Sequence, residues 1–144
     1  MKLVIGGAFQ GKLDWAKRTY GLREGWADGS LCGLEEIWSC PGMFHFHEYV
    51  LRAMKQGMLQ SEQEGEAFAR RLLERNPGLI LVTNELGYGI VPTDAFDRRF
   101  REMTGRICTG LAAEAEEVVR VVCGLGVKLK EAKEEPSHVF SPLC

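Results

Sequence analysis

Long apolar runs, an excess of basic residues and paired cysteine motifs are all missing from this chain of 144 residues. Without a run of about 20 apolar residues there is no candidate membrane span, and the start of the chain lacks the long apolar core of a signal peptide. A formal net charge of −2 gives no electrostatic case for nucleic acid or an anionic membrane as the main partner. We therefore expect a cytoplasmic protein that binds neither.

The five cysteines include no C-x-x-C pair, and their number is odd. This pattern argues against a disulfide framework and against a zinc site. In a reducing compartment such residues are free thiols, some of them buried as small apolar side chains. The apolar and charged fractions, 45% and 26%, are ordinary for a globular protein, and the length fits one domain.

The stretch from Gly6 to Lys12 matches the phosphate-binding loop pattern G-x-x-x-x-G-K-[ST] except at its last position. It follows a short apolar run and opens a segment that can be helical, which is the context that the motif requires. In such loops backbone N–H groups and the positive end of the helix surround a polyphosphate, and the lysine reaches its terminal phosphates. The expected nucleotide-binding residues are Gly6, Gly7, Ala8, Phe9, Gln10, Gly11, Lys12 and Leu13.

Leu13 is the departure from this motif, because a Ser or Thr hydroxyl at that position normally holds Mg²⁺. Magnesium usually needs only one or two carboxylates beside phosphates and waters. Glu48 is the nearest candidate for a substitute anchor and Asp28 is another, so the metal ligand stays unknown at this point. The alternative interpretation of the whole stretch is a glycine-rich turn with an incidental lysine.

Apolar periodicity predicts strands that alternate with helices. Strands are predicted at residues 2–5, 26–28, 43–48, 79–83 and 118–123. Helices are predicted at residues 12–20, 33–38, 49–54 and 64–75, and from residue 93 onward. This alternation predicts a three-layer α/β domain with a mostly parallel sheet over residues 1–130, followed by a tail at 131–144.

Polar residues follow the predicted strand at 79–83, and ligands of open α/β sheets bind at the carboxyl ends of strands. Glu85 is placed there to act as a general base on a substrate hydroxyl or to hold metal-bound water. The alternative is a carboxylate that only accepts hydrogen bonds from loop amides. Asn84 either shapes the loop or contacts a ligand, and Gly87 supplies a backbone conformation that other residues disfavour.

His45 and His47 lie two residues apart, so on a strand both side chains would point to one face. They could bind a metal, accept a nucleotidyl group, or be buried and hydrogen-bonded. No third ligand stands at a recognised spacing, so we favour a structural or site-lining role over a metal site.

Several of these segments together resemble the adenosylcobinamide kinase / adenosylcobinamide-phosphate guanylyltransferase family of cobalamin biosynthesis. Residues 6–12 are similar to its G-G-A-R-S-G-K-S loop, and residues 82–92 are very close to its V-T-N-E-V-G-x-G-I-V-P signature. Residues 111–130 resemble its closing helix, strand and hairpin. Residues 22–76 are shorter than in the family, and its histidine-bearing helix and D-C-L-T-L-W strand are not recognisable there.

The resemblance implies a RecA-like P-loop fold and a kinase that uses ATP or GTP, with Mg²⁺, to phosphorylate the hydroxyl of the aminopropanol arm of adenosylcobinamide, a corrinoid. It also implies a second activity, transfer of GMP from GTP through a guanylylated histidine, and assembly as a homo-oligomer, a trimer.

We expect Lys12 and Glu85 to be catalytic, with Lys12 stabilising the transferring phosphoryl group. Residues expected to contact the substrate or line its site are Asn84, Gly87, His45, His47 and Glu48. Leu13 favours an alternative, a non-catalytic member that binds a nucleotide or corrinoid as a sensor or assembly partner. A third hypothesis is a structural relic with an empty loop.

Overall fold

The computed structural model of the chain describes residues 1–86 and 94–131. Six strands form one sheet: β1 (Lys2–Gly6), β2 (Trp26–Asp28), β3 (Gly42–Phe44), β4 (Ile80–Asn84), β5 (Glu117–Val122) and β6 (Leu125–Lys130). The helices are α1 (Lys12–Tyr20), α2 (Phe46–Lys55), α3 (Glu62–Arg75) and α4 (Ala95–Glu114), with a short 3-10 helix η1 (Leu34–Trp38). No helix within the described ranges is both long and apolar enough to cross a membrane.

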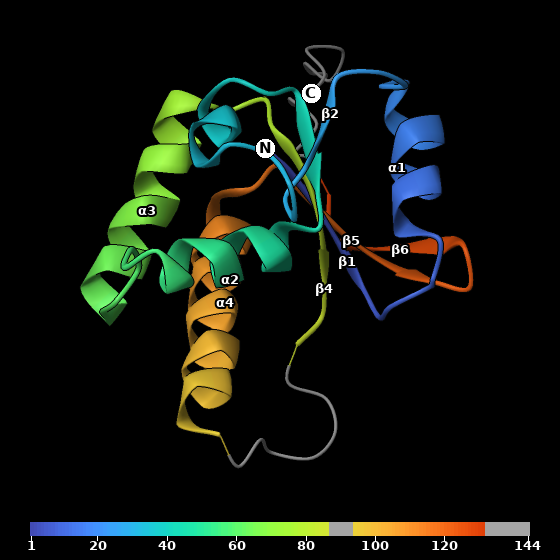
Figure 1. Ribbon diagram of the computed structural model, residues 1–144. Helices are drawn as coiled ribbons and strands as arrows, with labels where there is room; N and C mark the ends of the chain where they lie inside the picture. Colours follow the sequence, from blue (N-terminus) through green and yellow to red (C-terminus); the bar gives the residue numbers. More distant parts are fainter. Residues whose placement is uncertain (87–93, 132–144) are drawn as a thin grey trace, which may run out of the picture.

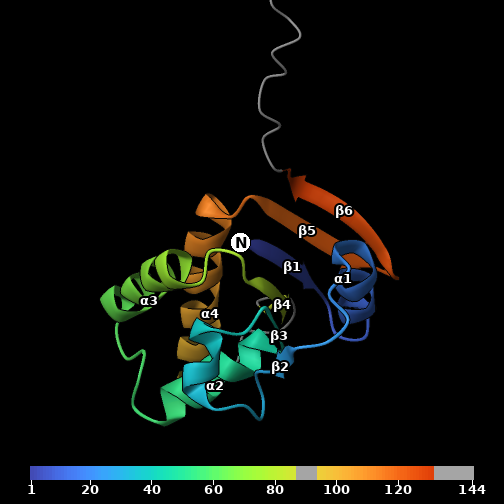
Figure 2. The ribbon, with the colours of Figure 1, turned by 90° about the horizontal axis from the view of Figure 1, so that it is seen from above.

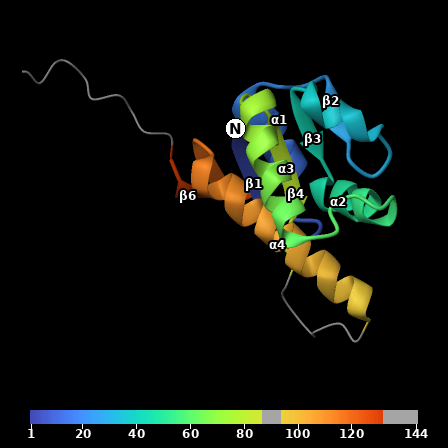
Figure 3. The same cartoon turned by 90° about the vertical axis from the view of Figure 1, so that its left-hand side faces the viewer.

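The strands lie in the order β2-β3-β4-β1-β5-β6, and every neighbouring pair is parallel except β5 and β6 (Figure 2). Helix α1 covers one face of the sheet, while α2, α3 and α4 cover the other (Figures 1 and 3). The predicted three-layer α/β architecture with a mostly parallel sheet is therefore confirmed.

Strand β4 shows why the central strands read as continuous apolar runs. Leu81 faces the large core under α2, α3 and α4, whereas Val82 faces the smaller core under α1. Both side chains are buried because helices cover both faces of the sheet, as is usual for parallel strands. Each such burial stabilises the fold by about 1.5–3 kcal/mol.

The predicted strand at residues 43–48 is wrong in its second half. The strand ends at Phe44, His45 adopts a left-handed backbone (φ 55°), and helix α2 begins at Phe46. The reason is that the apolar spacing changes from that of a strand to that of a helix at this point. The buried apolar residues of α2 are Phe46, Tyr49, Val50 and Ala53. His45 and His47 therefore do not share the face of a strand.

Other boundaries shift by one or two residues. Helix α3 begins at Glu62 because the Ser61 side chain accepts a hydrogen bond from the Glu64 amide at 3.1 Å. Helix α4 begins at Ala95, where Asp94 caps the amides of Phe96 and Asp97. Residues 87–93 and 132–144 lie outside the described residues, and with them Gly87, part of the 82–92 signature and most of the predicted tail.

The connections place a ligand-binding edge between β1 and β4. Helix α1 leads from β1 toward β2 on one face, and α4 leads from β4 to β5 on the other. Where connections from neighbouring strands diverge to opposite faces, the carboxyl ends of the strands leave room for a ligand. The loop that follows β1 lies at this edge.

Candidate functional site

The backbone amides of the loop between β1 and α1 have no backbone partner among the described residues. Within residues 1–86 and 94–131, no backbone hydrogen bond is donated by the amides of residues 7–12. Gly11 precedes α1 in a left-handed conformation, and Phe9 also has a positive φ of 58°. Left-handed backbone at a bulky residue is unfavourable and is typical of functional loops. Free amides next to a helix N-terminus form an anion-binding cradle.

Gly6 is required at the end of β1 by close packing. A Cβ atom at this position would lie 2.5 Å from the Val121 carbonyl oxygen and 3.1 Å from Cδ of Lys12. The absence of a side chain therefore lets β5 approach the loop and lets the aliphatic part of Lys12 cross over the backbone.

Gln10 connects the loop to the turn between β5 and β6. Its side-chain Oε1 accepts a hydrogen bond from the Cys123 amide (2.7 Å), and its backbone oxygen accepts one from the Gly124 amide (2.8 Å). Cys123 and Gly124 both have positive φ, as a two-residue hairpin turn of type I′ requires. The strand hairpin thus supports the loop from outside.

Lys12 is held over this loop. The side chain is only 8% exposed, and its ammonium donates a hydrogen bond to the Gly7 carbonyl oxygen at 2.7 Å. Burial lowers the pKa of Lys12, and the negative charge of Glu85 opposes that shift. The ammonium therefore lies beside the free amides, where it can bind the same anion.

A cavity of about 570 Å³ opens in front of the loop. The loop residues from Ala8 to Leu13 form one wall. The other described lining residues are Ser30, Phe44, His45, His47, Glu48, Val82 and Asn84. The Phe9 ring is fully exposed, and Leu13 packs in part against the core under α1. Although both residues line the cavity, it remains open, and its volume suits a small-molecule ligand.

The remaining wall of the cavity includes Ser30 and His45, which belong to a hydrogen-bonded cluster at the ends of β2 and β3. Asp28 Oδ1 accepts hydrogen bonds from the Ser30 amide (2.9 Å), the Ser30 hydroxyl (2.6 Å) and His45 Nδ1 (3.0 Å). Burial alone would raise the pKa of Asp28, but the bonds from Ser30 and His45 outweigh it and lower the pKa. Asp28 is therefore a carboxylate near neutral pH.

His47 lies deeper in the same wall and is bonded differently. Its Nδ1 accepts a hydrogen bond from the Asn84 amide at 3.3 Å, and its Nε2 lies 3.7 Å from Glu48 Oε1. Burial lowers the pKa of His47; Glu48 raises it, while the charges of His45 and Lys12 lower it further. The expectation of a site-lining residue fits His47, whose ring also joins the ends of β3 and β4.

Glu85 lies beside the loop but lines a neighbouring cavity of about 450 Å³ on the α4 side of the sheet. Its amide donates to the Gly6 carbonyl oxygen at 2.8 Å, and its carboxylate oxygens accept from Arg120 Nε (2.8 Å) and Nη2 (3.3 Å). A bidentate carboxylate–guanidinium pair of this kind has a fixed geometry. The predicted general base is thus held by a cation and does not line the described part of the Lys12 cavity.

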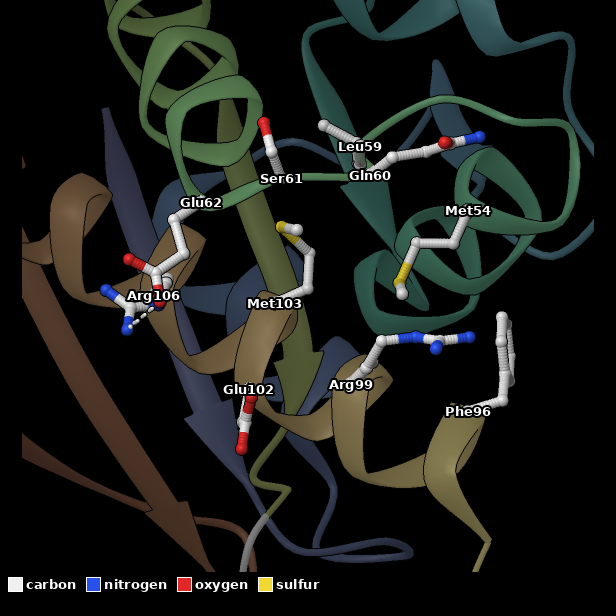
Figure 4. Close-up of a pocket in the computed structure, with 10 residues that line it drawn as sticks. All are labelled: Met54, Leu59, Gln60, Ser61, Glu62, Phe96, Arg99, Glu102, Met103 and Arg106. Carbon is white, nitrogen blue, oxygen red and sulfur yellow. Dashed lines mark ion pairs between the residues drawn. The ribbon is translucent and has the colours of Figure 1, made fainter.

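Another cavity, of about 470 Å³, lies between α2, α3 and α4 (Figure 4). Glu62 and Arg106 form an ion pair of 2.7 Å across it, and Arg99 reaches toward Met54 from α4. Its described lining includes no residue of the phosphate-binding loop. Because anion-binding amides and Lys12 meet only in the loop cavity, we take that cavity as the functional site.

Metal ligands are sparse in the described part of the chain, where no group of three His, Cys, Asp or Glu side chains is placed to hold an ion. Glu48 is the only carboxylate among the described lining residues of the loop cavity. A single carboxylate fits magnesium that is held mainly by phosphates and waters, and does not fit an all-protein cage.

Sequence reasoning missed three contacts around the candidate site. Arg120 interrupts the apolar run of β5, and a charged residue inside such a run is a signal that could have found it. Ser30 belongs to an Asp-Gly-Ser turn directly after β2, the position where ligands bind in parallel sheets. The pairing of Asp28 with His45 had no signal, since 17 residues separate them.

Comparison with known families adds an independent finding. A sequence model described as cobinamide kinase / cobinamide phosphate guanyltransferase matches residues 42–129. The match covers β3 through most of β6, and it leaves the loop at residues 6–12 outside. It also includes residues 42–76, which we had not recognised as similar to the family.

Curated relatives carry names from the same pathway. The bifunctional adenosylcobalamin biosynthesis protein CobU of Escherichia coli (strain K12) is 42% identical over 83 residues, 58% of this chain and 44% of that protein. CobU of Salmonella typhimurium is 54% identical over 52 residues, 36% of this chain and 29% of that protein. The bifunctional protein CobP of Pseudomonas aeruginosa is 37% identical over 67 residues, 46% of this chain and 39% of that protein.

The matched segments thus span less than half the length of each of these relatives. The family match, in contrast, extends over more than half of the chain described above. The three-layer α/β fold, the loop after β1 and the sequence match lead to one conclusion: the chain belongs to the cobinamide kinase / cobinamide phosphate guanyltransferase family.

Proposed function

We propose that this protein is a nucleotide-dependent kinase that phosphorylates the hydroxyl of the aminopropanol arm of adenosylcobinamide in cobalamin biosynthesis. The observation that supports the proposal is that residues 8–12 line one cavity, that their amides donate no described backbone hydrogen bond, and that Lys12 is held over the same loop. The family membership supplies the substrate class.

The loop would bind the triphosphate of ATP or GTP through its amides and the N-terminus of α1. Lys12 would leave the Gly7 carbonyl oxygen and stabilise the negative charge of the transferring phosphoryl group. Magnesium, when bound, neutralises phosphate charge, and Glu48 is the residue that would hold it. In this scheme Leu13 contributes packing and no metal ligand.

Glu85 would act on Lys12 rather than on the substrate. Its carboxylate is fixed by Arg120 and raises the pKa of Lys12, against the effect of burial. The Arg120–Glu85 pair therefore favours the charged lysine that the triphosphate needs.

Calorimetry with ATP and GTP, with and without Mg²⁺, tests nucleotide binding, and a phosphorylation assay on adenosylcobinamide tests the chemistry. We expect tight, magnesium-dependent binding and transfer of the terminal phosphoryl group. Absence of nucleotide binding would show that the loop is a structural relic.

A second candidate function is a non-catalytic sensor or assembly partner that binds a nucleotide or a corrinoid. Leu13 favours it, because the usual hydroxyl ligand of Mg²⁺ is absent. Nucleotide binding that does not depend on Mg²⁺, together with no phosphorylation of adenosylcobinamide, would support this candidate over the kinase.

We further propose that copies of the chain assemble through the β5–β6 hairpin, as the trimer implied by the resemblance suggests. The hairpin exposes four large apolar side chains: Val122, Leu125, Val127 and Leu129. Leu125 is the most exposed of them at 72%. β6 is the last strand of the sheet, and an apolar edge strand favours association.

Light scattering after size exclusion measures this assembly. We expect the double variant Leu125→Lys with Leu129→Lys to have a smaller mass than the wild type, because two charges would enter the interface. Met58→Lys changes an exposed apolar residue elsewhere and should leave the mass unchanged. Identical masses for all three proteins would contradict assembly through the hairpin.

A further inference from the structure

The wall of the loop cavity that includes Ser30 and His45 contains an arrangement that the nucleotide-binding role does not use. Asp28 Oδ1 receives His45 Nδ1 at 3.0 Å and is also bonded by the amide and the hydroxyl of Ser30. His45 lines the same cavity as Lys12, and its side chain is half exposed. The imidazole is therefore anchored at one nitrogen and accessible from the cavity.

The anchoring determines which nitrogen of His45 carries the proton. A carboxylate only accepts hydrogen bonds, so the neutral ring must carry its hydrogen on Nδ1 when it pairs with Asp28. The lone pair is then on Nε2, the nitrogen that does not contact Asp28. An imidazole oriented in this way by a carboxylate can take a proton from a hydroxyl, and the carboxylate stabilises the resulting cation.

His47 provides an internal contrast. Its Nδ1 accepts the Asn84 amide, so the neutral ring carries its hydrogen on Nε2. Its side chain is also 9% exposed, against 50% for His45. Of the two histidines in this wall, His45 is the one arranged to accept a proton from a ligand in the cavity.

The backbone around the pair is fixed from several directions. The Gly29 amide donates to the Phe44 carbonyl oxygen at 2.8 Å, and a Cβ atom at Gly29 would lie 2.4 Å from the His45 carbonyl oxygen. Arg52 of α2 donates to the carbonyl oxygens of Gly29 (2.9 Å) and Cys32 (2.6 Å). His45 itself is held in the unfavourable left-handed conformation. This degree of preorganisation is expected of a catalytic group.

We propose that His45, oriented by Asp28, is the general base that deprotonates the acceptor hydroxyl during phosphoryl transfer. The inference rests on the proposed kinase function and names a further catalytic residue for it. The hydroxyl oxygen forms the new bond to phosphorus while its proton moves to His45 Nε2. The bond between that phosphorus and the nucleoside diphosphate breaks, and the diphosphate leaves with the electron pair. The imidazolium then returns its proton to water.

Steady-state kinetics of His45→Gln with adenosylcobinamide as acceptor test this role. General base catalysis contributes about 10²–10⁴-fold, so we expect kcat to fall by about that factor. The Kd for the nucleotide, measured by calorimetry without acceptor, should not change.

Asp28→Asn and Ser30→Ala separate orientation from folding. Asp28→Asn replaces the carboxylate that holds His45 Nδ1 at 3.0 Å, so kcat should fall while the Kd for the nucleotide stays unchanged. Ser30→Ala removes one of the bonds to Asp28 and should have a smaller effect in the same direction. Asp97→Asn, an exposed carboxylate on α4, serves as the matched control. Nitrogen chemical shifts of His45, which do not depend on activity, should show the Nδ1–H form in the wild type.

Distinct outcomes would overturn this role. If the wild type binds nucleotide but does not phosphorylate adenosylcobinamide, both the proposed kinase function and the proposed role of His45 are contradicted. If the wild type is active and the His45→Gln variant is equally active, only the proposed role of His45 as general base is contradicted. A covalent nucleotide on His45, detected by intact mass after incubation with GTP, would make this residue a nucleophile instead.

Discussion

The two walls of the loop cavity are built in different ways. The loop wall, residues 6–13, is one continuous segment whose amides, glycines and lysine follow a known pattern. The histidine wall, formed by Ser30, His45, His47 and Glu48, comes from two segments at the ends of β2 and β3, and Asp28 supports it through hydrogen bonds to Ser30 and His45. The loop wall offers positive charge, and the histidine wall offers proton acceptors and a carboxylate.

Under the proposed function, this difference divides the chemistry between the two walls. A triphosphate requires hydrogen-bond donors, and the loop wall offers backbone amides and Lys12 within seven residues. An acceptor hydroxyl requires a base, and magnesium requires a carboxylate; the histidine wall contains candidates for both. The proposed base His45 and the carboxylate Glu48 line the same cavity and make no described hydrogen bond or ion pair with Lys12. Alterations to each wall should therefore have separable effects.

Substitution of Lys12 should have the largest effect. We expect Lys12→Ala to reduce phosphoryl transfer by about 10²–10³-fold, since loss of one preorganised donor to a developing charge typically costs this much. Lys17→Ala, on the same helix but away from the cavity, should keep full activity. Initial rates of phosphoryl transfer at saturating nucleotide provide the measurement. Unchanged rates for Lys12→Ala would contradict a catalytic role for Lys12.

Gly6→Ala should distort the loop wall without touching the histidine wall. The new Cβ would meet the Val121 backbone at 2.5 Å, so we expect a loss of about 1–3 kcal/mol in the free energy of unfolding. Gly105→Ala in α4 is the control, because nothing lies within 4 Å of its Cβ and alanine favours a helix by about 0.5–1 kcal/mol. Urea denaturation should therefore show a lower free energy of unfolding for Gly6→Ala and a higher one for Gly105→Ala.

Arg52→Met should loosen the histidine wall selectively. Two charge-assisted hydrogen bonds to the segment after β2 would be lost, and each is worth about 1.5–3 kcal/mol at most when fully buried. Since Arg52 is only partly buried, we expect the lower end of this range in total, together with a weakened Asp28–His45 contact. Lys55→Met, exposed on the same helix, is the control. Equal stability of both variants would mean that Arg52 does not hold this segment.

Glu85→Gln should give the smallest effect, which should be visible only in the pH dependence of nucleotide affinity. Nucleotide affinity needs the charged Lys12, so it should decline as pH rises through the pKa of Lys12. Glu85 raises that pKa, and its removal should therefore move the decline to lower pH. Calorimetric titrations at a series of alkaline pH values measure the shift. A shift to higher pH, or a loss of phosphoryl transfer at neutral pH as large as that of Lys12→Ala, would point to a direct catalytic role for Glu85.

The local pattern of apolar residues was sufficient to predict the secondary structure of some segments and insufficient for others. Residues 79–83 were predicted as a central strand because a run apolar on both faces fits only a covered sheet, and β4 confirms it. Residues 43–48 were predicted as one strand because Met43, Phe44 and the two histidines partly alternate. Burial of Tyr49, Val50 and Ala53 against the other helices decided for a helix from Phe46.

The sequence by itself determined the layered fold and the position of the glycine-rich loop after β1, because both depend on residues that are close neighbours along the chain. Only the tertiary structure placed Glu85 against Arg120, tied Gln10 to the β5–β6 turn and joined Asp28 to His45. Those contacts connect residues 17 to 113 positions apart. Their partners are selected by the order of strands in the sheet, which no local spacing encodes.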